Sequence, residues 1–231
     1  DSFLSLKPKI EIILNIDSDH LDYFKDIDHI VSSFDKFAHL VPGSGTIIAY
    51  DANPFVNQAI RDLDNVVTFG LSENCDYYAA NIKFNDDGMP SFDVCHDGKL
   101  LSRVQLAVPG EHNILNALAA FTCACVLGVE PALTKETLEA YHGTQRRFDL
   151  VGTTARGVKI VDDYAHHPNE LRAAITSVRE MFPARKLTVV FQPHLYTRTR
   201  DFYREFAEAL SLCDEVLLLP IYPAREEPIE G

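Results

Sequence analysis

Three short segments of the chain gather side chains that could bind or activate an anionic substrate. Each follows a run of apolar residues, and together they hold histidines, aspartates and arginines at residues 15–22, 162–168 and 192–201. Ligands of doubly wound sheets bind beyond the carboxyl ends of the strands. One such segment alone is as readily explained by chance, but the three together predict a ligand site.

The first segment offers oxygen and imidazole ligands to a divalent cation, from Asp17, Asp19, His20 and Asp22. Mg²⁺ favours oxygen ligands and keeps several waters, so a histidine ligand is unusual for it. On chemistry alone the alternative is slightly favoured, in which the aspartates cap the next helix and His20 packs.

Arginines near the second and third segments could bind phosphate or carboxylate. Arg198 and Arg200 begin a predicted helix, where the helix dipole disfavours a cation, and this placement favours a functional role over a solvated one. Their planar guanidinium groups can fork onto an oxyanion. Arg146 and Arg147 stand at a predicted domain boundary and could meet phosphate there.

A further polar group lies at the start of a predicted helix, where His112, Asn113 and Asn116 share one side. Asparagine in such a place caps the helix or hydrogen-bonds to an amide-like or purine-like edge. The chain contains no Gly-x-x-x-x-Gly-Lys-Ser/Thr phosphate loop. If the protein uses a nucleotide, its main phosphate loop lies elsewhere.

Alternating strands and helices must position these groups in the first half of the chain. Short β-branched runs predict parallel strands, and apolar residues at helical spacing predict the helices between them. The period then changes to two, which predicts a small antiparallel patch before two further helices. The predicted strands are 9–16, 46–50, 66–70, 77–84, 91–95 and 99–108, and the predicted helices are 27–40, 54–63, 112–127 and 134–141.

A boundary is predicted near Gly143, after which the alternation restarts. Strands at 158–162, 186–191 and 215–219 alternate with helices at 168–181 and 198–212. This is the start of a doubly wound parallel sheet.

Composition limits the class of protein. The 231 residues carry 21 Lys and Arg against 34 Asp and Glu, a net charge of −13, and 46% are hydrophobic. The chain is too apolar for a disordered protein, has no membrane-spanning run, and is too acidic for a general binder of nucleic acid or membrane surfaces. Five cysteines without a Cys-x-x-Cys fit a reducing cytoplasm. The abrupt ends suggest a piece of a longer protein.

The ordered motifs resemble those of the Mur ligases. The resemblance spans essentially the whole chain and rests on residues 15–22, 109–117, 146–149, 162–168 and 191–200. It implies an α/β fold class with two partial domains. Residues 1–143 would be part of a P-loop-type central, ATP-binding domain with a small antiparallel patch. Residues 144–231 would be a truncated Rossmann-like doubly wound domain. The N-terminal domain, the phosphate loop and the C-terminal end of the family would be missing.

The resemblance also implies an activity: ATP-dependent ligation of L-alanine to UDP-N-acetylmuramate through an acyl phosphate, in bacterial peptidoglycan synthesis. This piece alone is expected to be inactive. By position in the motifs, the metal ligand for Mg²⁺ would be His20. The ATP site would comprise His112, Asn113, Asn116, Arg146, Arg147, Asp163 and Tyr164. Tyr164, His166, His194 and Arg198 would bind substrate, and the last three would be catalytic.

Two alternatives stay open. A ligase that attaches a tripeptide to the same sugar nucleotide during murein recycling shares the residues 162–168 motif, although its segment matching 196–200 typically differs. A non-catalytic module that only holds a nucleotide or a partner is the alternative from another class.

Overall fold

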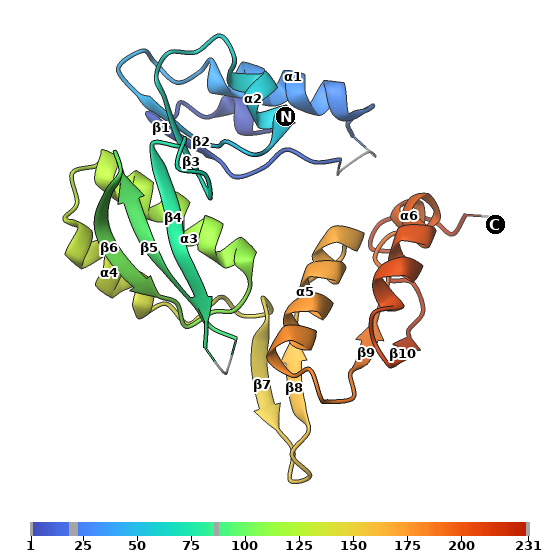
Figure 1. Cartoon of the computed structure of the whole chain (residues 1–231). Helices are drawn as coiled ribbons and strands as arrows, with labels where there is room; N and C mark the ends of the chain where they lie inside the picture. Colours follow the sequence, from blue (N-terminus) through green and yellow to red (C-terminus); the bar gives the residue numbers. More distant parts are fainter. Residues whose placement is uncertain (1, 19–22, 86–87, 230–231) are drawn as a thin grey trace. The chain divides into compact units, whose positions relative to one another are not determined.

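The computed structural model describes residues 2–18, 23–85 and 88–229, which form two compact units. The first unit comprises residues 1–85 and 89–142, and the main part of the second is 143–231 (Figure 1). The predicted metal ligand His20, with Asp19 and Asp22, lies outside the described residues.

The first unit is built on a six-stranded sheet in which the strands follow their order along the chain. The first four strands pair in parallel, and the last three pair antiparallel. The strands are β1 (Ile10–Ile13), β2 (Thr46–Tyr50), β3 (Val66–Gly70), β4 (Tyr77–Phe84), β5 (Pro90–His96) and β6 (Lys99–Gln105). The α/β class and the antiparallel patch predicted from the sequence are confirmed.

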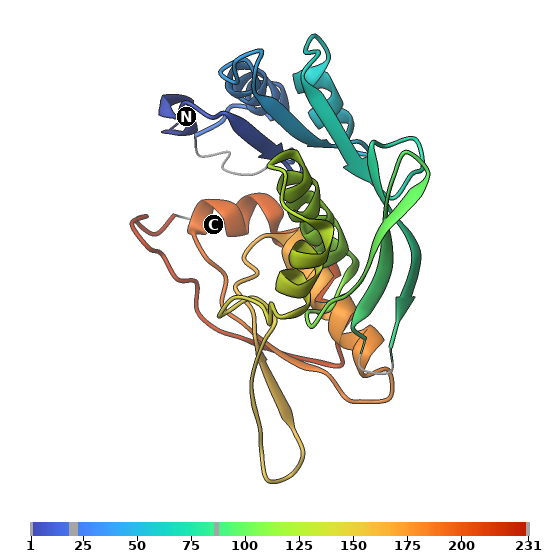
Figure 2. The same cartoon turned by 90° about the vertical axis from the view of Figure 1, so that its left-hand side faces the viewer.

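Helices cover both faces of this sheet, as the largely apolar runs of its parallel strands require. Ile47 and Ala49 of β2 pack in one cluster with residues of α1 (Ile27–Ala38) and α2 (Pro54–Ile60). Ile48 faces the other way, into a cluster with α3 (Glu111–Val126), and α4 (Pro131–Glu139) contacts β6. Figures 1 and 2 show α3 lying along the sheet. A 3₁₀ turn (Ser2–Ser5) precedes β1.

One buried group interrupts the apolar pattern of β1. Glu11 is 3% exposed and pairs in register with the fully buried Ile47. Both of its carboxylate oxygens are buried without a hydrogen-bond partner among the described residues. Burial raises the pKa of Glu11 from 4.5 to about 7, because an ionised carboxylate loses its hydration there.

The second unit contains two separate two-stranded sheets. Its elements are β7 (Asp149–Thr153), β8 (Lys159–Asp162), α5 (Pro168–Met181), β9 (Thr188–Phe191), α6 (Tyr196–Leu210) and β10 (Glu215–Leu218). The parallel pair β9–β10 is as predicted, with α5 and α6 packed together beside it. Strand β8, however, pairs antiparallel with β7, a strand that was not predicted.

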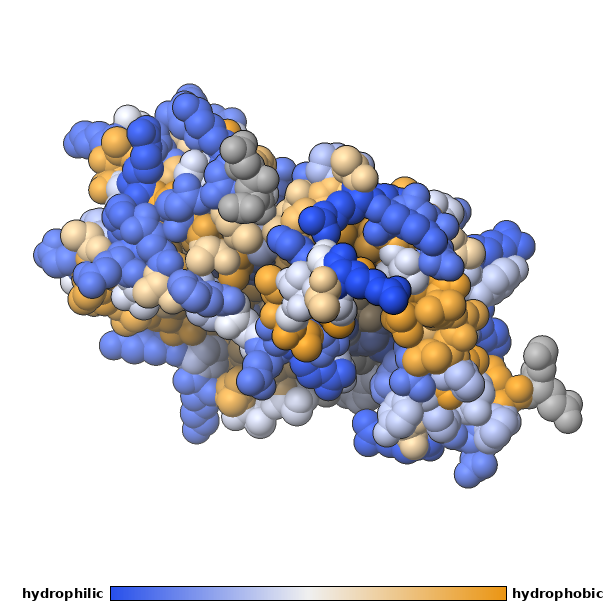
Figure 3. Space-filling model, turned by 90° about the horizontal axis from the view of Figure 1, so that it is seen from below, coloured by the Kyte–Doolittle hydropathy of each residue, from blue (hydrophilic) through white to orange (hydrophobic). Residues whose placement is uncertain are grey.

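Apolar side chains remain exposed on this second unit. Val190 of β9 is 61% exposed and Leu218 of β10 is 65% exposed. Apolar residues of the β7–β8 hairpin are exposed too. Figure 3 shows such apolar surface among the polar residues. Within the described residues, no helix combines the length and the apolarity needed to cross a bilayer.

Candidate functional site

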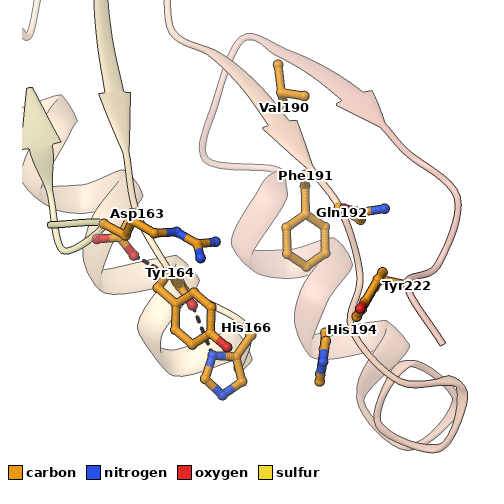
Figure 4. Close-up of a pocket in the computed structure, with 10 residues that line it drawn as sticks. Asp163, Tyr164, His166, Val190, Phe191, Gln192, His194 and Tyr222 are labelled. Carbon is orange, nitrogen blue, oxygen red and sulfur yellow. Dashed lines mark hydrogen bonds between the residues drawn. The ribbon is translucent and has the colours of Figure 1, made fainter. Parts of the chain in front are cut away.

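A pocket of about 460 Å³ opens in the second unit, beyond the ends of β8 and β9. It is lined by Arg146, Asp163, Tyr164, Ala165, His166, Val190, Phe191, Gln192, His194 and Tyr222. In Figure 4, Asp163, Tyr164 and His166 lie on one side, and Phe191, His194 and Tyr222 lie on the other. Five of these residues were predicted site residues, and they come from three separate segments.

The loop after β8 is held by the start of α5. His167 caps the helix by accepting from the Asn169 amide, and the Glu170 carboxylate accepts from the amides of His166 (3.1 Å) and His167 (3.3 Å). This reciprocal capping box fixes the backbone on which His166 stands. The His166 ring lies with Nδ1 2.9 Å from the Tyr164 carbonyl oxygen, and the neutral ring can donate there.

Asp163 connects two loop segments beside the pocket, one at Phe148 and one at Ala165. Its carboxylate accepts from the amide of Phe148 at 2.8 Å and from the amide of Ala165 at 2.7 Å. The amide of Tyr164 donates in return to the carbonyl of Arg146 at 2.7 Å. Arg146 and Phe148 both have positive φ, 62° and 52°, a conformation that costs energy in non-glycine residues. Asp163 therefore stabilises a strained segment that carries the paired arginines.

The two arginines gather on the Tyr164 ring. Their guanidinium carbons lie 4.8 Å (Arg146) and 5.5 Å (Arg147) from the ring centroid, within the range of cation–π attraction. Arg147 also forms an ion pair with Glu170 at 3.5 Å. Burial alone would raise the pKa of Glu170. Hydrogen bonds from the His166 and His167 amides and nearby charges, that of Arg147 among them, outweigh burial and lower this pKa. The arrangement presents positive charge beside the pocket, where phosphate or carboxylate oxygens can bind.

His194 stands on the opposite wall, after β9. Its ring stacks against Tyr222 with centroids 5.6 Å apart and lies 6.2 Å from the His166 ring. Its Nδ1 atom is buried without a hydrogen-bond partner among the described residues. Burial, then the charges of Arg198 and His166, lower the pKa of His194, which keeps the imidazole neutral near pH 7. A neutral imidazole can accept a proton from a substrate.

Arg198 lies in the first turn of α6 and is 9% exposed. Its guanidinium is therefore withdrawn from solvent at a helix N-terminus, and its role toward an anionic ligand stays a prediction. Arg200, two residues on, is exposed and pairs with the neighbouring Asp201 at 2.7 Å. The two arginines thus differ in the structure, Arg198 being buried and Arg200 exposed.

The predicted ATP-site residues His112, Asn113 and Asn116 lie in the first unit, at the start of α3. Asn113 donates to the carbonyl of Pro109 at 2.7 Å, and Asn116 donates to the Asn113 side chain at 3.4 Å. Asn113 therefore ties the first turn of α3 to the residues before it, but it does not cap the helix, because the N-cap is Gly110 and no side chain accepts a capping hydrogen bond there. His112 and Asn116 are exposed.

No metal cluster can be assigned in the described part of the chain. There, no three His, Cys, Asp or Glu side chains meet in a group that could hold an ion. Asp17 accepts from the amide of Ser18 at 2.7 Å. The Mg²⁺ prediction rests on His20 and stays a prediction.

Among the residues that line or support the site, the sequence analysis missed Glu170, Tyr222 and Glu226. Tyr222 follows β10 as His194 follows β9, and the rule about strand ends could have found it. Glu170 was visible as the third helical residue of a capping box. Glu226 contacts Thr197, 29 residues earlier, and no local pattern indicates that contact.

With this geometry in place, comparison with known proteins assigns the class. The family model of the Mur ligase middle domain matches residues 2–124, and that of the Mur ligase glutamate ligase domain matches residues 146–230. The chain belongs to the Mur ligase family.

Within the family, the chain is similar to alanine ligases. It is 46% identical over 228 residues to UDP-N-acetylmuramate–L-alanine ligase of Alkaliphilus metalliredigens, a match that covers 98% of this chain and 49% of that protein. The solved UDP-N-acetylmuramate–alanine ligase MurC of Thermotoga maritima is 29% identical, with a TM-score of 0.77 over 95% of this chain and 47% of that one.

A second solved ligase is also similar. UDP-N-acetylmuramate:L-alanyl-γ-D-glutamyl-meso-diaminopimelate ligase of Neisseria meningitidis is 30% identical, with a TM-score of 0.55 over 62% of this chain and 43% of that one. The chain spans about half the length of the curated relatives it matches.

Proposed function

We propose that the full-length protein carrying this chain joins L-alanine to UDP-N-acetylmuramate with hydrolysis of ATP, in the cytoplasm of a bacterium. The pocket that brings His166, His194 and Tyr222 opposite one another beside the Tyr164-bound arginines carries the proposal. Relatives named UDP-N-acetylmuramate–L-alanine ligase, at 42–46% identity over 98% of the chain, support the choice of substrates.

The proposed chemistry has two steps. The muramoyl carboxylate attacks the γ-phosphorus of ATP and ADP leaves, which gives an acyl phosphate. The amine of L-alanine then attacks the acyl carbon and phosphate leaves. Mg²⁺, when bound, would neutralise phosphate charge. Because negative charge develops in both steps, fixed cations at the pocket lower both barriers.

Five residues in or near the pocket have a task in this scheme. Arg146 and Arg147 bind phosphate oxygens from their places on the Tyr164 ring. Arg198 and His166 orient the carboxylate of the incoming alanine. Neutral His194 accepts the proton that the amine loses as the new amide bond forms.

The remaining assignments rest on position in the family motifs. His20 would hold Mg²⁺, and His112, Asn113 and Asn116 would lie at the adenine. The first unit would then be part of the ATP-binding domain and the second unit part of the domain that brings in the amino acid.

Turnover by the full-length protein tests the proposal. Phosphate release should require UDP-N-acetylmuramate, ATP and L-alanine together. Release that requires the recycled tripeptide in place of alanine would instead identify a recycling ligase. Nucleotide binding with no release under either condition would favour a non-catalytic module.

A further inference from the structure

The start of α6, with His194 just before it and Arg198 in its first turn, has no side-chain cap at its N-cap residue. Leu195 occupies the N-cap position with a φ of 73°, and no side chain at the cap accepts a hydrogen bond there. A leucine with positive φ is strained, and the first amides of a helix need acceptors. The stabilising contacts must come from elsewhere.

A segment near residue 226 supplies those contacts. The Glu226 carboxylate accepts from the amide of Thr197 at 3.1 Å through Oε2 and from the Thr197 hydroxyl through Oε1. These hydrogen bonds, first that of the Thr197 side chain, lower the pKa of Glu226, so that it is ionised near pH 7. A carboxylate at the N-terminus of a helix also gains from the helix dipole.

Tyr222 binds the same region through the backbone. Its amide donates to the carbonyl of Pro193 at 2.8 Å, and its carbonyl accepts from the amide of Leu195 at 2.9 Å. Together with the stacked rings, these bonds form a parallel bridge between Tyr222 and His194. The backbone on both sides of His194 is therefore fixed from the segment that also carries Glu226.

We propose that Glu226 is a positioning residue, which completes the N-terminus of α6 and so holds His194 and Arg198 in their catalytic geometry. The proposal rests on the proposed ligase function. Glu226 acts through the helix and through its charge and does not touch substrate. Burial, Arg198 and His166 lower the pKa of His194, and the negative charge of Glu226 partly offsets them by raising it.

The adjacent glutamates provide a matched pair for the test. Glu226→Gln keeps one acceptor oxygen but loses the charge, and Glu226→Ala loses both. Glu227→Gln is the control, because Glu227 is exposed and is the next residue in the chain. In the 231-residue chain, Glu226→Ala should speed amide hydrogen exchange at Thr197 at least tenfold, and Glu226→Gln should lower the pKa of His194 measured by NMR. Glu227→Gln should change neither.

Kinetics of the full-length protein complete the test. Glu226→Gln should lower kcat/KM for L-alanine on the order of tenfold and leave KM for ATP within twofold, because the arginines on Tyr164 are held separately. Unchanged Thr197 exchange would overturn the proposal, and so would unchanged kcat/KM in an active enzyme. A wild-type enzyme that releases no phosphate would instead overturn the ligase function, while NMR still reports whether Glu226 holds the helix.

Discussion

The burial of Arg198 predicts that its shape matters as well as its charge. Arg198→Lys in the full-length protein should lose about 2–4 kcal/mol of transition-state stabilisation, because lysine cannot supply the planar fork to an oxyanion. Arg200→Lys is the control, since Arg200 is exposed and pairs with Asp201. Steady-state kinetics with all three substrates should show a large loss of kcat/KM for the first variant only. Equal kcat/KM for the Arg198→Lys and Arg200→Lys variants would mean that Arg198 is not in the site.

The unpaired carboxylate of Glu11 predicts that stability depends on pH. Because the folded pKa is about 7 against 4.5 ordinarily, its contribution is fully present below pH 4.5 and is lost as pH rises through 7. The loss is at most about 3 kcal/mol.

Glu11→Met should remove this loss and raise Tm by several degrees at pH 8, with a much smaller change at pH 4. Glu136→Met, at an exposed position of α4, is the control. A Tm difference between wild type and Glu11→Met that is the same at both pH values would show that the pKa of Glu11 is not raised in the folded chain.

At the scale of elements, the turn between α1 and β2 requires glycine at one position and tolerates alanine two residues before. A Cβ on Gly45 would lie 2.4 Å from the Lys9 carbonyl oxygen, whereas a Cβ on Gly43 would meet nothing within 4 Å. Gly45→Ala should therefore destabilise the chain by about 1–3 kcal/mol, and Gly43→Ala should be neutral or slightly stabilising. Urea denaturation measures both, and equal midpoints would contradict the close approach of β1 and β2.

Local patterns predicted most elements, but not the contacts that complete the site. Apolar spacing located β2, β3, β4 and α5 to the residue, because each buries a continuous face or run. Strand β7 was missed because its sequence, Asp-Leu-Val-Gly-Thr, is short, exposed and interrupted by a register shift next to Gly152. The contacts of Tyr222 and Glu226 depend on chain pairing across about 29 residues, which no periodicity encodes.

At the scale of the whole molecule, the 231 residues should not ligate on their own. They hold arginines that can bind phosphate but no Gly-x-x-x-x-Gly-Lys-Ser/Thr loop, whose backbone amides and lysine hold the β- and γ-phosphates. Incubating the chain with ATP, UDP-N-acetylmuramate and L-alanine should release no phosphate above the background without protein. The full-length protein is the positive control, and measurable release by the chain would contradict the expectation.

The capping of α6 by Glu226 also sets an order of events during synthesis. Thr197 leaves the ribosome 29 residues before the carboxylate that binds it. At a typical elongation rate, the helix start stays incomplete for about 1.5–6 s. During that interval the strained turn at Leu195 has no partner from residues 222–226, and the pocket wall with His194 cannot yet form. The N-terminal end of α6 is therefore completed only after the rest of the helix and residues 222–226 have been synthesised.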